Sequence, residues 1–420
     1  MYCRFSTLIC LLFLAAIPCL QAQESEQPKL VIKPTLAMQL WSTFTDGQQL
    51  FNTDIEQFEP VDNRLNFSLH RTRAGIKGSY GDRWIYDFTT SLDFVGQDVL
   101  SGNVGAFNNT ASPKFRIWNA LVQYKLSEKT EGLYWTLGYF SPLISRESST
   151  SPFNVGSFQK AWSQNYIRRH VSGTGPGRIV GTNFGGLFKA ENNKLAFDYN
   201  LGLWNPRLIG FSGNSAGIIF SPLLTFRLAV HIGDAESNKY SRGLTFNHKG
   251  QRNGVTLAVS GSHQGTSDLW DSNTSFGVDL LANFGPLNIS GEWMQLEREL
   301  ADIETSVNTG FIKAGYYLPL DNGRMLEPVL AYVFLDGATD ARGQEDAASL
   351  GAFAGTDNYF EITLNYYASS KVRFSLGYTF RNGDEGAISP TEINNNFLQQ
   401  GSVGTIQRGN YLGFGLLFSI

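Results

Sequence analysis

The sequence ends with Tyr411-Leu-Gly-Phe-Gly-Leu-Leu-Phe-Ser-Ile420, in which every even-numbered residue is large and apolar. The odd-numbered residues include two glycines and a serine, so a β-strand here has one apolar face and one mixed face. An apolar strand at a chain end leaves an open sheet edge unless another strand pairs with it. Closure into a barrel removes that edge, and lipid can then cover the apolar face. The stretch therefore predicts the closing strand of a transmembrane β-barrel.

The same alternation recurs along the whole chain. Residues 360–366 alternate Phe, Ile, Leu and Tyr with Glu, Thr and Asn, and residues 372–380 repeat the pattern. A large soluble β-protein could also show this period, with its apolar faces turned inward. The apolar faces here are uniformly large and often aromatic, and the opposite faces carry small as well as charged residues. This combination favours a membrane barrel with its apolar face outward.

The spacing of the strands also indicates a barrel. Short connections, such as 191–194 and 368–371, alternate with long ones at 96–113, 141–177, 338–356 and 382–408, as in outer-membrane barrels. Alternating segments number seventeen, including one at 241–249, but bacterial barrels have an even count. A further short strand at 216–220 would give eighteen, and one falsely split segment would give sixteen. We therefore predict an all-β, single antiparallel barrel of 16–18 strands, with eighteen favoured by parity.

Composition agrees with this fold class. The 420 residues include 44 Gly and 56 aromatic residues, only 17% are charged, and the net charge is −4. No basic excess indicates a nucleic-acid partner. All three cysteines lie within residues 1–22, which have the apolar core and small-residue cleavage site of a signal peptide. We predict cleavage near Ala22, export to the bacterial outer membrane, and one barrel domain over 23–420 without disulfides or thiolate metal sites.

One segment carries a more specific signal than the period. Phe67-Ser-Leu-His-Arg-Thr-Arg-Ala-Gly-Ile-Lys-Gly78 precedes a short turn and another strand. It resembles the second and third strands of the phosphate-selective porin O/P family, where an Arg-Arg-Ala-Arg run leads to Gly-x-Lys-Gly. His70 departs from the first arginine of that run. The matching residues are Arg71, Arg73, Gly75, Lys77 and Gly78.

A second block is similar to the same family. Trp118-Asn-Ala-Leu-Val-Gln-Tyr124 is followed by Leu137-Gly-Tyr-Phe-Ser-Pro142 and Glu147. The resemblance covers about 60–150 and is weaker beyond. It implies sixteen strands, a homotrimer in outer-membrane lipid and lipopolysaccharide, and a general diffusion or anion channel. It does not identify phosphate as the solute.

The loop at 141–177 is the candidate functional segment. It follows the fifth predicted strand, the position from which the third outer loop of porins folds into the lumen. Clustered arginines in a confined channel attract anions and can bind phosphate with two hydrogen bonds. Alternatively, Arg168 and Arg169 are solvated or bind lipopolysaccharide phosphate. The candidate constriction residues are Arg146, Glu147, Lys160, Arg168, Arg169 and Arg178.

The charges predicted to face the lumen are mixed, which favours a weakly selective constriction. They include acidic Asp87, Asp198 and Glu361 as well as basic Arg227 and the basic residues within 371–381. We predict passive diffusion of small hydrophilic solutes or inorganic anions, with no enzyme activity, cofactor or metal. A solute-binding uptake partner that conducts little is one alternative. The other is an outer-membrane hydrolase using Ser215 in Gly213-Asn-Ser-Ala-Gly217, although that motif needs a strand-turn-helix context that the sequence does not show.

Overall fold

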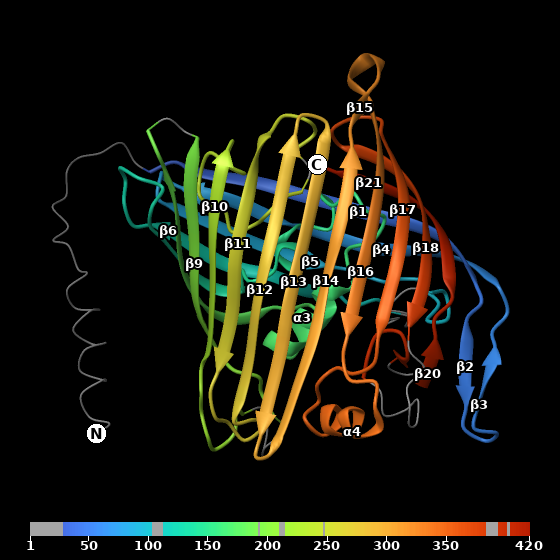
Figure 1. Cartoon of the computed structure of the whole chain (residues 1–420). Coiled ribbons are helices and arrows are strands. Elements are labelled where there is room, and N and C mark those ends of the chain that lie inside the picture. The colour runs from blue at the N-terminus through green and yellow to red at the C-terminus, as the bar shows by residue number, and fades with distance from the viewer. Residues whose placement is uncertain are drawn as a thin grey trace.

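A computed structural model describes residues 28–102, 112–191, 194–209, 215–246, 248–383, 394–400 and 404–420. The predicted signal peptide at 1–22 lies outside these residues. The chain forms an antiparallel barrel (Figure 1). Its wall strands are β1 (Leu30–Asp46), β4 (Arg64–Tyr80), β5 (Trp84–Ser91), β6 (Arg116–Lys125), β7 (Tyr134–Phe140), β8 (Ile179–Lys189), β9 (Leu195–Trp204), β10 (Leu223–Gly233), β11 (Asn253–Gln264), β12 (Ser272–Phe284), β13 (Leu287–Leu300), β14 (Ile303–Tyr316), β16 (Met325–Asp336), β17 (Asp357–Tyr367), β18 (Val372–Gly383) and β21 (Asn410–Ser419).

The first and last strands close the barrel. β1 pairs with β4 on one side and with β21 on the other, in a register that places Ala37 opposite Ser419 and Asp46 opposite Asn410. The prediction that the C-terminal stretch is the closing strand is confirmed. Closure pairs the backbone groups that an edge strand would leave open, as a lipid environment requires.

Sixteen strands form the wall, the lower end of the predicted range. The sheet holds 17 strands, but the two-residue β15 (Leu318–Pro319) pairs only with β16 within a turn. The favoured count of eighteen was wrong for two reasons. Residues 241–246 enter the lumen instead of crossing the wall, and residues 216–220 form no strand. The alternation of Leu244 and Phe246 with small residues reflects lumenal packing, which has the same local pattern as a strand.

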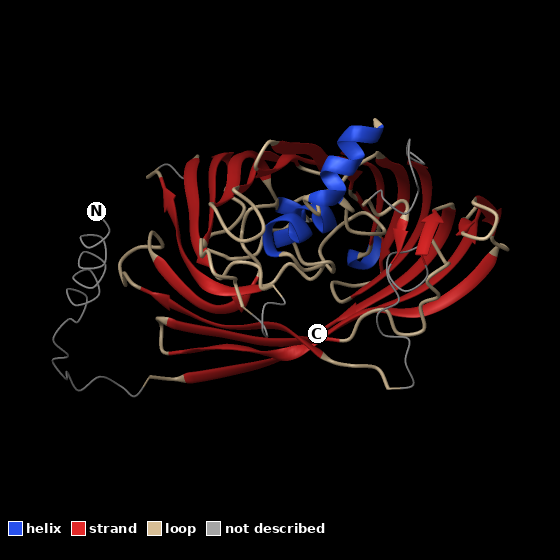
Figure 2. Ribbon diagram, turned by 90° about the horizontal axis from the view of Figure 1, so that it is seen from below, coloured by secondary structure: helices blue, strands red, loops and turns tan. Residues whose placement is uncertain are grey.

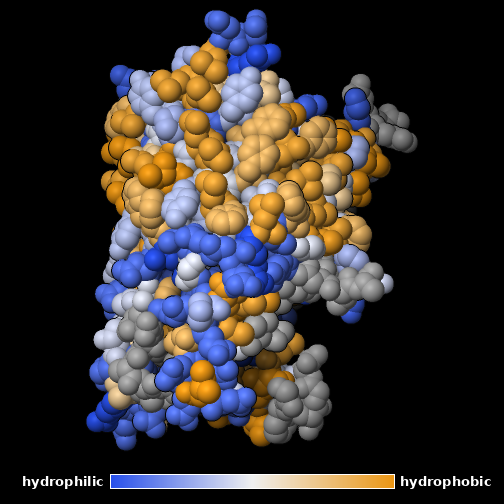
Figure 3. Space-filling view, turned by 90° about the vertical axis from the view of Figure 1, so that its right-hand side faces the viewer, coloured by the Kyte–Doolittle hydropathy of each residue, from blue (hydrophilic) through white to orange (hydrophobic). Residues whose placement is uncertain are grey.

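The predicted facing of the strands is confirmed. On β17, Phe360, Ile362 and Leu364 are 39–47% exposed, whereas Glu361 and Thr363 are each 1% exposed. Apolar residues cover a broad band on the face seen in Figure 3, and a hydrophilic region lies below that band. The outward side chains therefore present a hydrocarbon-compatible surface, and the inward ones meet polar groups.

The two ends of the barrel differ. At the inner end, where β1 begins and β21 ends, most connections are short, although the turn before β16 contains the 3-10 helix η1 (Asp321–Gly323). The outer end carries the longer connections with helices α2 (Arg146–Ser149), α3 (Ser163–Ser172) and α4 (Ala341–Ser349). A small four-stranded sheet also lies at the outer end, formed by β2 (Gln49–Asn52), β3 (Gln57–Pro60), β19 (Gln399–Gln400) and β20 (Gly404–Gln407). Among the described residues, no helix is long and apolar enough to span a membrane.

Candidate functional site: the constricted lumen

The loop 141–177 folds into the barrel. Helices and loops occupy the interior of the ring of strands when the barrel is viewed along its axis (Figure 2). Within the loop, the Ser145 side chain caps α2 by accepting a hydrogen bond from the Ser148 N–H. α3 ends at Gly173, which adopts the left-handed conformation (φ 70°) that glycine tolerates best. These local signals fix two short helices that turn inside the lumen.

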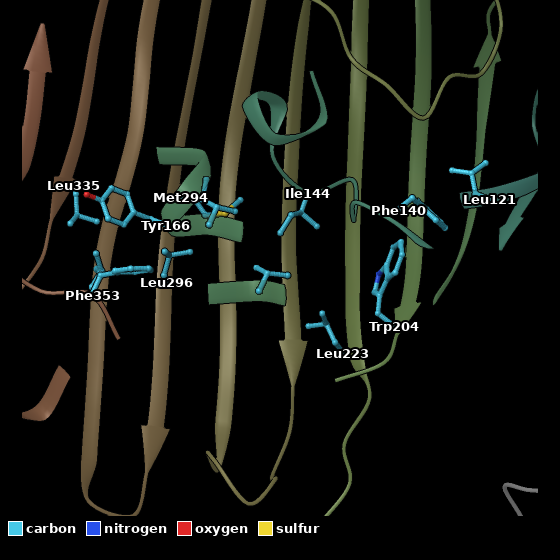
Figure 4. Packing of buried hydrophobic residues seen from close by; sticks show 13 residues of the cluster. Leu121, Phe140, Ile144, Tyr166, Trp204, Leu223, Met294, Leu296, Leu335 and Phe353 are labelled. Atoms are coloured by element: carbon cyan, nitrogen blue, oxygen red, sulfur yellow. The ribbon is translucent and has the colours of Figure 1, made fainter. Parts of the chain in front are cut away.

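Apolar packing holds α3 against one side of the wall. Tyr166, Ile167 and Val171 are each 5% exposed or less and belong to one cluster with inward residues of β13, β14 and β16. Figure 4 shows Tyr166 close to Leu335 and Phe353, with Met294 and Leu296 of β13 nearby. The Tyr166 ring meets Phe353 edge-on at 4.8 Å, and its hydroxyl donates to the Asp357 carboxylate. A lumen-facing wall is normally polar, so this apolar patch is specific for the loop.

Phe158 anchors the middle of the loop. Its ring is 2% exposed and stacks on Trp41 at 4.4 Å. It lies over glycines on β18 and β21: a Cβ on Gly377 would be 2.7 Å from the Phe158 Cβ, and a Cβ on Gly413 would overlap the ring. These inward glycines, which the sequence shows only as the small-residue face of the last strands, form a seat for the side chain.

Acidic residues of the wall are used to hold the loop. Glu361 accepts from the Phe158 N–H at 2.7 Å, and Glu292 accepts from the Ser145 hydroxyl at 2.9 Å and from the Arg146 N–H. Asp279 accepts from the Arg146 Nε at 2.7 Å. Buried carboxylates are stable only when paired or hydrogen-bonded, and here the loop provides the partners. These acids therefore do not face the open part of the lumen.

The open part is a cavity of about 1140 Å³ between the loop and the β4–β7 side of the wall. Its lining carries eleven Lys and Arg side chains but only four Asp and Glu side chains. The basic residues are Arg71, Arg73, Lys77, Lys114, Arg116, Lys160, Arg168, Arg169, Arg178, Lys239 and Arg242, and the acidic ones are Asp87, Asp93, Asp198 and Glu236. Acidic and basic side chains are mixed along the sequence but are separated in the structure. The acids that anchor the loop lie on one side of the barrel, and the basic side chains line the cavity.

The arginines gather around Trp118. The guanidinium carbons of Arg73 and Arg178 lie 3.6 Å and 3.4 Å from the centroid of its ring, so they occupy opposite faces. Arg73 also pairs with Asp93 at 2.5 Å. Arg168 donates to the Ser148 carbonyl at 2.8 Å, and its Nε has no hydrogen-bond partner. Burial and the neighbouring charge of Arg71 lower the pKa of Arg168 to about 9, so it is still cationic at neutral pH.

The predicted constriction residues divide into two groups. Lys160, Arg168, Arg169 and Arg178 line the cavity. Arg146 and Glu147 instead lie in the packing between the loop and the wall. The structure therefore places four of the six predicted residues on the lining of the cavity.

Arg146 and Glu147 are both buried in ion pairs. Arg146 pairs with Glu236 and Asp279, each at 2.7 Å. Glu147 pairs with Lys313 at 2.8 Å and accepts from the Ala161 N–H at 2.6 Å. Both side chains brace the loop and contribute little charge to the cavity.

The residues that carry the family resemblance fall into two classes. Arg71, Arg73 and Lys77 line the cavity. Gly75 and Gly78 serve backbone packing, because an added Cβ would collide with the Phe88 and Val31 carbonyls respectively. The register of β4 thus brings the three basic side chains to the cavity, whereas the glycines permit close strand contacts.

Sequence reasoning missed several cavity residues. Arg116 lies at the start of β6, and Glu236, Lys239 and Arg242 lie in the long connection between β10 and β11. The length of the connection 234–252 was a usable signal, because it is too long for a turn at the inner end of a barrel. The strand predicted at 241–249 divided this connection and so hid its length.

Chemistry of other kinds has little support in the described residues. No group of three or more His, Cys, Asp or Glu residues suited to a metal ion occurs among them. Ser215 forms an isolated bridge with Ile209, its hydroxyl accepts from the Gly217 N–H at 3.1 Å, and no helix follows within 216–222. Residues 210–214, which include Gly213 and Asn214 of the Gly-x-Ser-x-Gly motif, lie outside the described residues. The strand-turn-helix context of a nucleophile elbow is not found after Ser215.

Solved structures with this fold are outer-membrane porins and channels. The anion-selective porin from Comamonas acidovorans matches 93% of this chain over 100% of its own length, with 12% identity and a TM-score of 0.56. Salmonella typhi OmpF, in complex with daunomycin, matches 93% of this chain over 100% of its length, with 13% identity and a TM-score of 0.55. The outer membrane channel DcaP of Acinetobacter baumannii matches 93% over 97%, with 12% identity and a TM-score of 0.53. No protein-family model and no curated protein matches the sequence. The barrel is therefore of the porin type, without assignment to the phosphate-selective O/P family.

Proposed function

We propose that this protein is an outer-membrane channel through which small hydrophilic solutes diffuse passively, with a preference for anions. The observation that carries the proposal is the charge of the cavity lining, with eleven basic and four acidic side chains. Each of those four acids already has a partner: Asp87 binds Thr89, Asp93 binds Arg73, Asp198 binds His231 and Glu236 binds Arg146. A confined passage with this lining raises the local concentration of anions.

Inorganic phosphate is the anion that we propose as a preferred solute. Guanidinium groups bind phosphate through paired, charge-assisted hydrogen bonds. Arg73, Arg168 and Arg178 lie together on the cavity lining, where water is restricted. The resemblance of residues 67–78 to phosphate-selective porins supports the same choice.

The direct test is the reversal potential of the purified protein in a planar bilayer across a KCl gradient. We expect anion preference that weakens above about 0.1 M salt, where the Debye length falls below about 10 Å. Arg169→Glu inverts an exposed charge on the lining and should shift the potential toward cations. Arg342→Glu is the matched control, because that side chain is 90% exposed on α4 and does not line the cavity. Cation preference in the unaltered protein, or equal behaviour of the two variants, would contradict the proposal.

The same recording distinguishes a diffusion channel from a solute-binding uptake partner that conducts little. A channel gives discrete conductance steps, whereas a binding protein gives none despite correct insertion. Phosphate should reduce the chloride current at millimolar concentration if it occupies the arginine cluster. Sulfate at the same concentration serves as the comparison for charge alone.

The proposal includes export with cleavage near Ala22 and assembly as a homotrimer in outer-membrane lipid and lipopolysaccharide. The sequence features of residues 1–22 support the first part, and the family resemblance supports the second. N-terminal sequencing of the membrane-extracted protein tests cleavage. Light scattering in detergent tests whether the particle contains three chains.

A further inference from the structure

The connection at 234–252, here called the inner segment, differs from the other turns at its end of the barrel. It joins β10 to β11 at the inner end, where neighbouring connections such as 285–286 and 368–371 are short. It also does not remain at the rim. All of residues 236–245 except Asn238 line the same cavity as the loop 141–177.

Two aromatic side chains fix the inner segment inside the barrel. Tyr240 is 8% exposed, its hydroxyl donates to the Asn200 side chain at 2.5 Å, and it accepts from the Asn183 amide at 3.2 Å. Phe246 is 2% exposed and meets the Phe311 ring edge-on at 5.9 Å. These contacts reach β8, β9 and β14, so the segment bridges separate parts of the wall inside the lumen.

The inner segment is joined to the loop 141–177. Both carboxylate oxygens of Glu236 accept from Arg146, at 2.7 Å and 3.1 Å. Although burial favours the neutral acid, the charge of Arg146 holds the pKa of Glu236 well below its usual range. The Leu244 N–H also donates to the Ser149 carbonyl at 3.2 Å. Two segments that enter from opposite ends of the barrel are therefore held together by a buried ion pair and a backbone hydrogen bond.

The part of the inner segment that faces the cavity is basic and has room beside it. Arg242 lies with its guanidinium carbon 5.5 Å from the centroid of Phe140, and Lys239 is on the same lining. Between them and the loop is Gly243, where an added Cβ would meet no atom nearer than the Ser149 carbonyl oxygen at 3.8 Å. The arginines around Trp118 and this surface line the same cavity.

We propose that the inner segment is a second constriction of the pore and that Arg242 is a second selectivity residue. The loop 141–177 narrows the passage from the outer end, and the inner segment narrows it from the inner end. The Glu236–Arg146 pair fixes the two at a constant separation. An anion thereby passes from the outer arginine cluster to Arg242 along a lining whose four acidic side chains each have a partner. This inference rests on the proposed channel function.

A charge inversion tests the selectivity role. Arg242→Glu changes the local charge by two units, which at about 10 Å in water alters the local anion concentration about fourfold. The local cation concentration rises by the same factor, so we expect the anion-to-cation permeability ratio to fall about sixteenfold at low salt. Lys371→Glu is the matched control, because it makes the same change on an exposed turn at the same end, away from the cavity.

A bulky side chain tests the constriction itself without altering charge. Gly243→Trp places an indole in the cavity and should reduce the single-channel conductance, whereas Ser370→Trp on an exposed turn at the same end should not. Heat-modifiable migration verifies that each variant is folded.

The outcomes separate the two proposals. If Arg242→Glu and Gly243→Trp behave like their controls while Arg169→Glu still shifts the reversal potential, the inner segment lies off the solute path and the inference is wrong. If none of the three changes selectivity or conductance, the proposed channel function fails with it.

Discussion

Removing the Phe158 side chain is expected to release the middle of the loop 141–177 from the wall. The ring is 2% exposed, stacks on Trp41 at 4.4 Å and fills the seat formed by Gly377 and Gly413. Truncation of a buried phenylalanine to alanine costs about 3–5 kcal/mol. Since about 1.4 kcal/mol corresponds to a factor of ten, the ratio of docked to undocked loop should fall about 10²–10⁴-fold. The hydrogen bonds from the Phe158 N–H to Glu361 and Thr363 remain available, so the barrel itself should still form.

The assay is single-channel conductance in a planar bilayer, with the current noise recorded at each voltage. We expect Phe158→Ala to conduct more and to fluctuate more than the unaltered protein. Gly413→Val should have the same effect, because the valine side chain would occupy the position of the Phe158 ring and displace it. Phe414→Ala is the matched control, since Phe414 is on the same strand, is 49% exposed and faces outward.

Two results would refute this reasoning. If Phe158→Ala and Gly413→Val conduct like the Phe414→Ala control, the ring does not position a constriction. If both variants fail to give heat-modifiable barrels while the control folds, Phe158 is needed for barrel assembly and not only for loop docking.

Three further predictions concern the facing of the wall residues, the closure of the barrel and the effect of low pH on loop docking. Leu376→Arg should impair membrane assembly by about 2–4 kcal/mol near the bilayer midplane, whereas Ser375→Arg, on the lumenal face, should assemble and affect only the docked loop; heat-modifiable folding yield measures both. Deletion of Leu416–Ile420 removes four of the ten residue pairs between β1 and β21, so folded protein should be lost from the membrane fraction. Burial holds the pKa of His170 well below its usual value, so the docked α3 binds fewer protons than an undocked one. Docking should therefore weaken as the pH falls below about 6.5, with larger current fluctuations at pH 4.5 than at pH 7, and His170→Gln should reduce that pH dependence.

Part of the functional site could be predicted because it depends on the order of strands. The loop after the fifth strand was expected in the lumen, and it does fold there, bringing Lys160, Arg168, Arg169 and Arg178 to the cavity. The pairing of Arg146 with Glu236 could not be foreseen, because those residues are 90 positions apart and meet only when two connections from opposite ends enter the same lumen. The role of these cavity residues in selectivity stays a prediction.

The sequence by itself determined the strands that cross the wall, the face that each turns outward, and closure by the last strand. The reason is that side-chain direction in a strand repeats every two residues, so the local alternation of apolar and polar residues shows which side chains face outward. Only the tertiary structure decided what fills the lumen. Residues 241–246 alternate like a strand yet lie inside the barrel, because packing against wall and loop selects the same apolar positions as a sheet does. The tertiary structure also decided which acidic side chains anchor the loop 141–177 and which face the cavity. Glu361 anchors the loop because the Phe158 N–H lies within hydrogen-bond distance of it. That contact joins residues far apart in the chain, so the local sequence around Glu361 does not encode it.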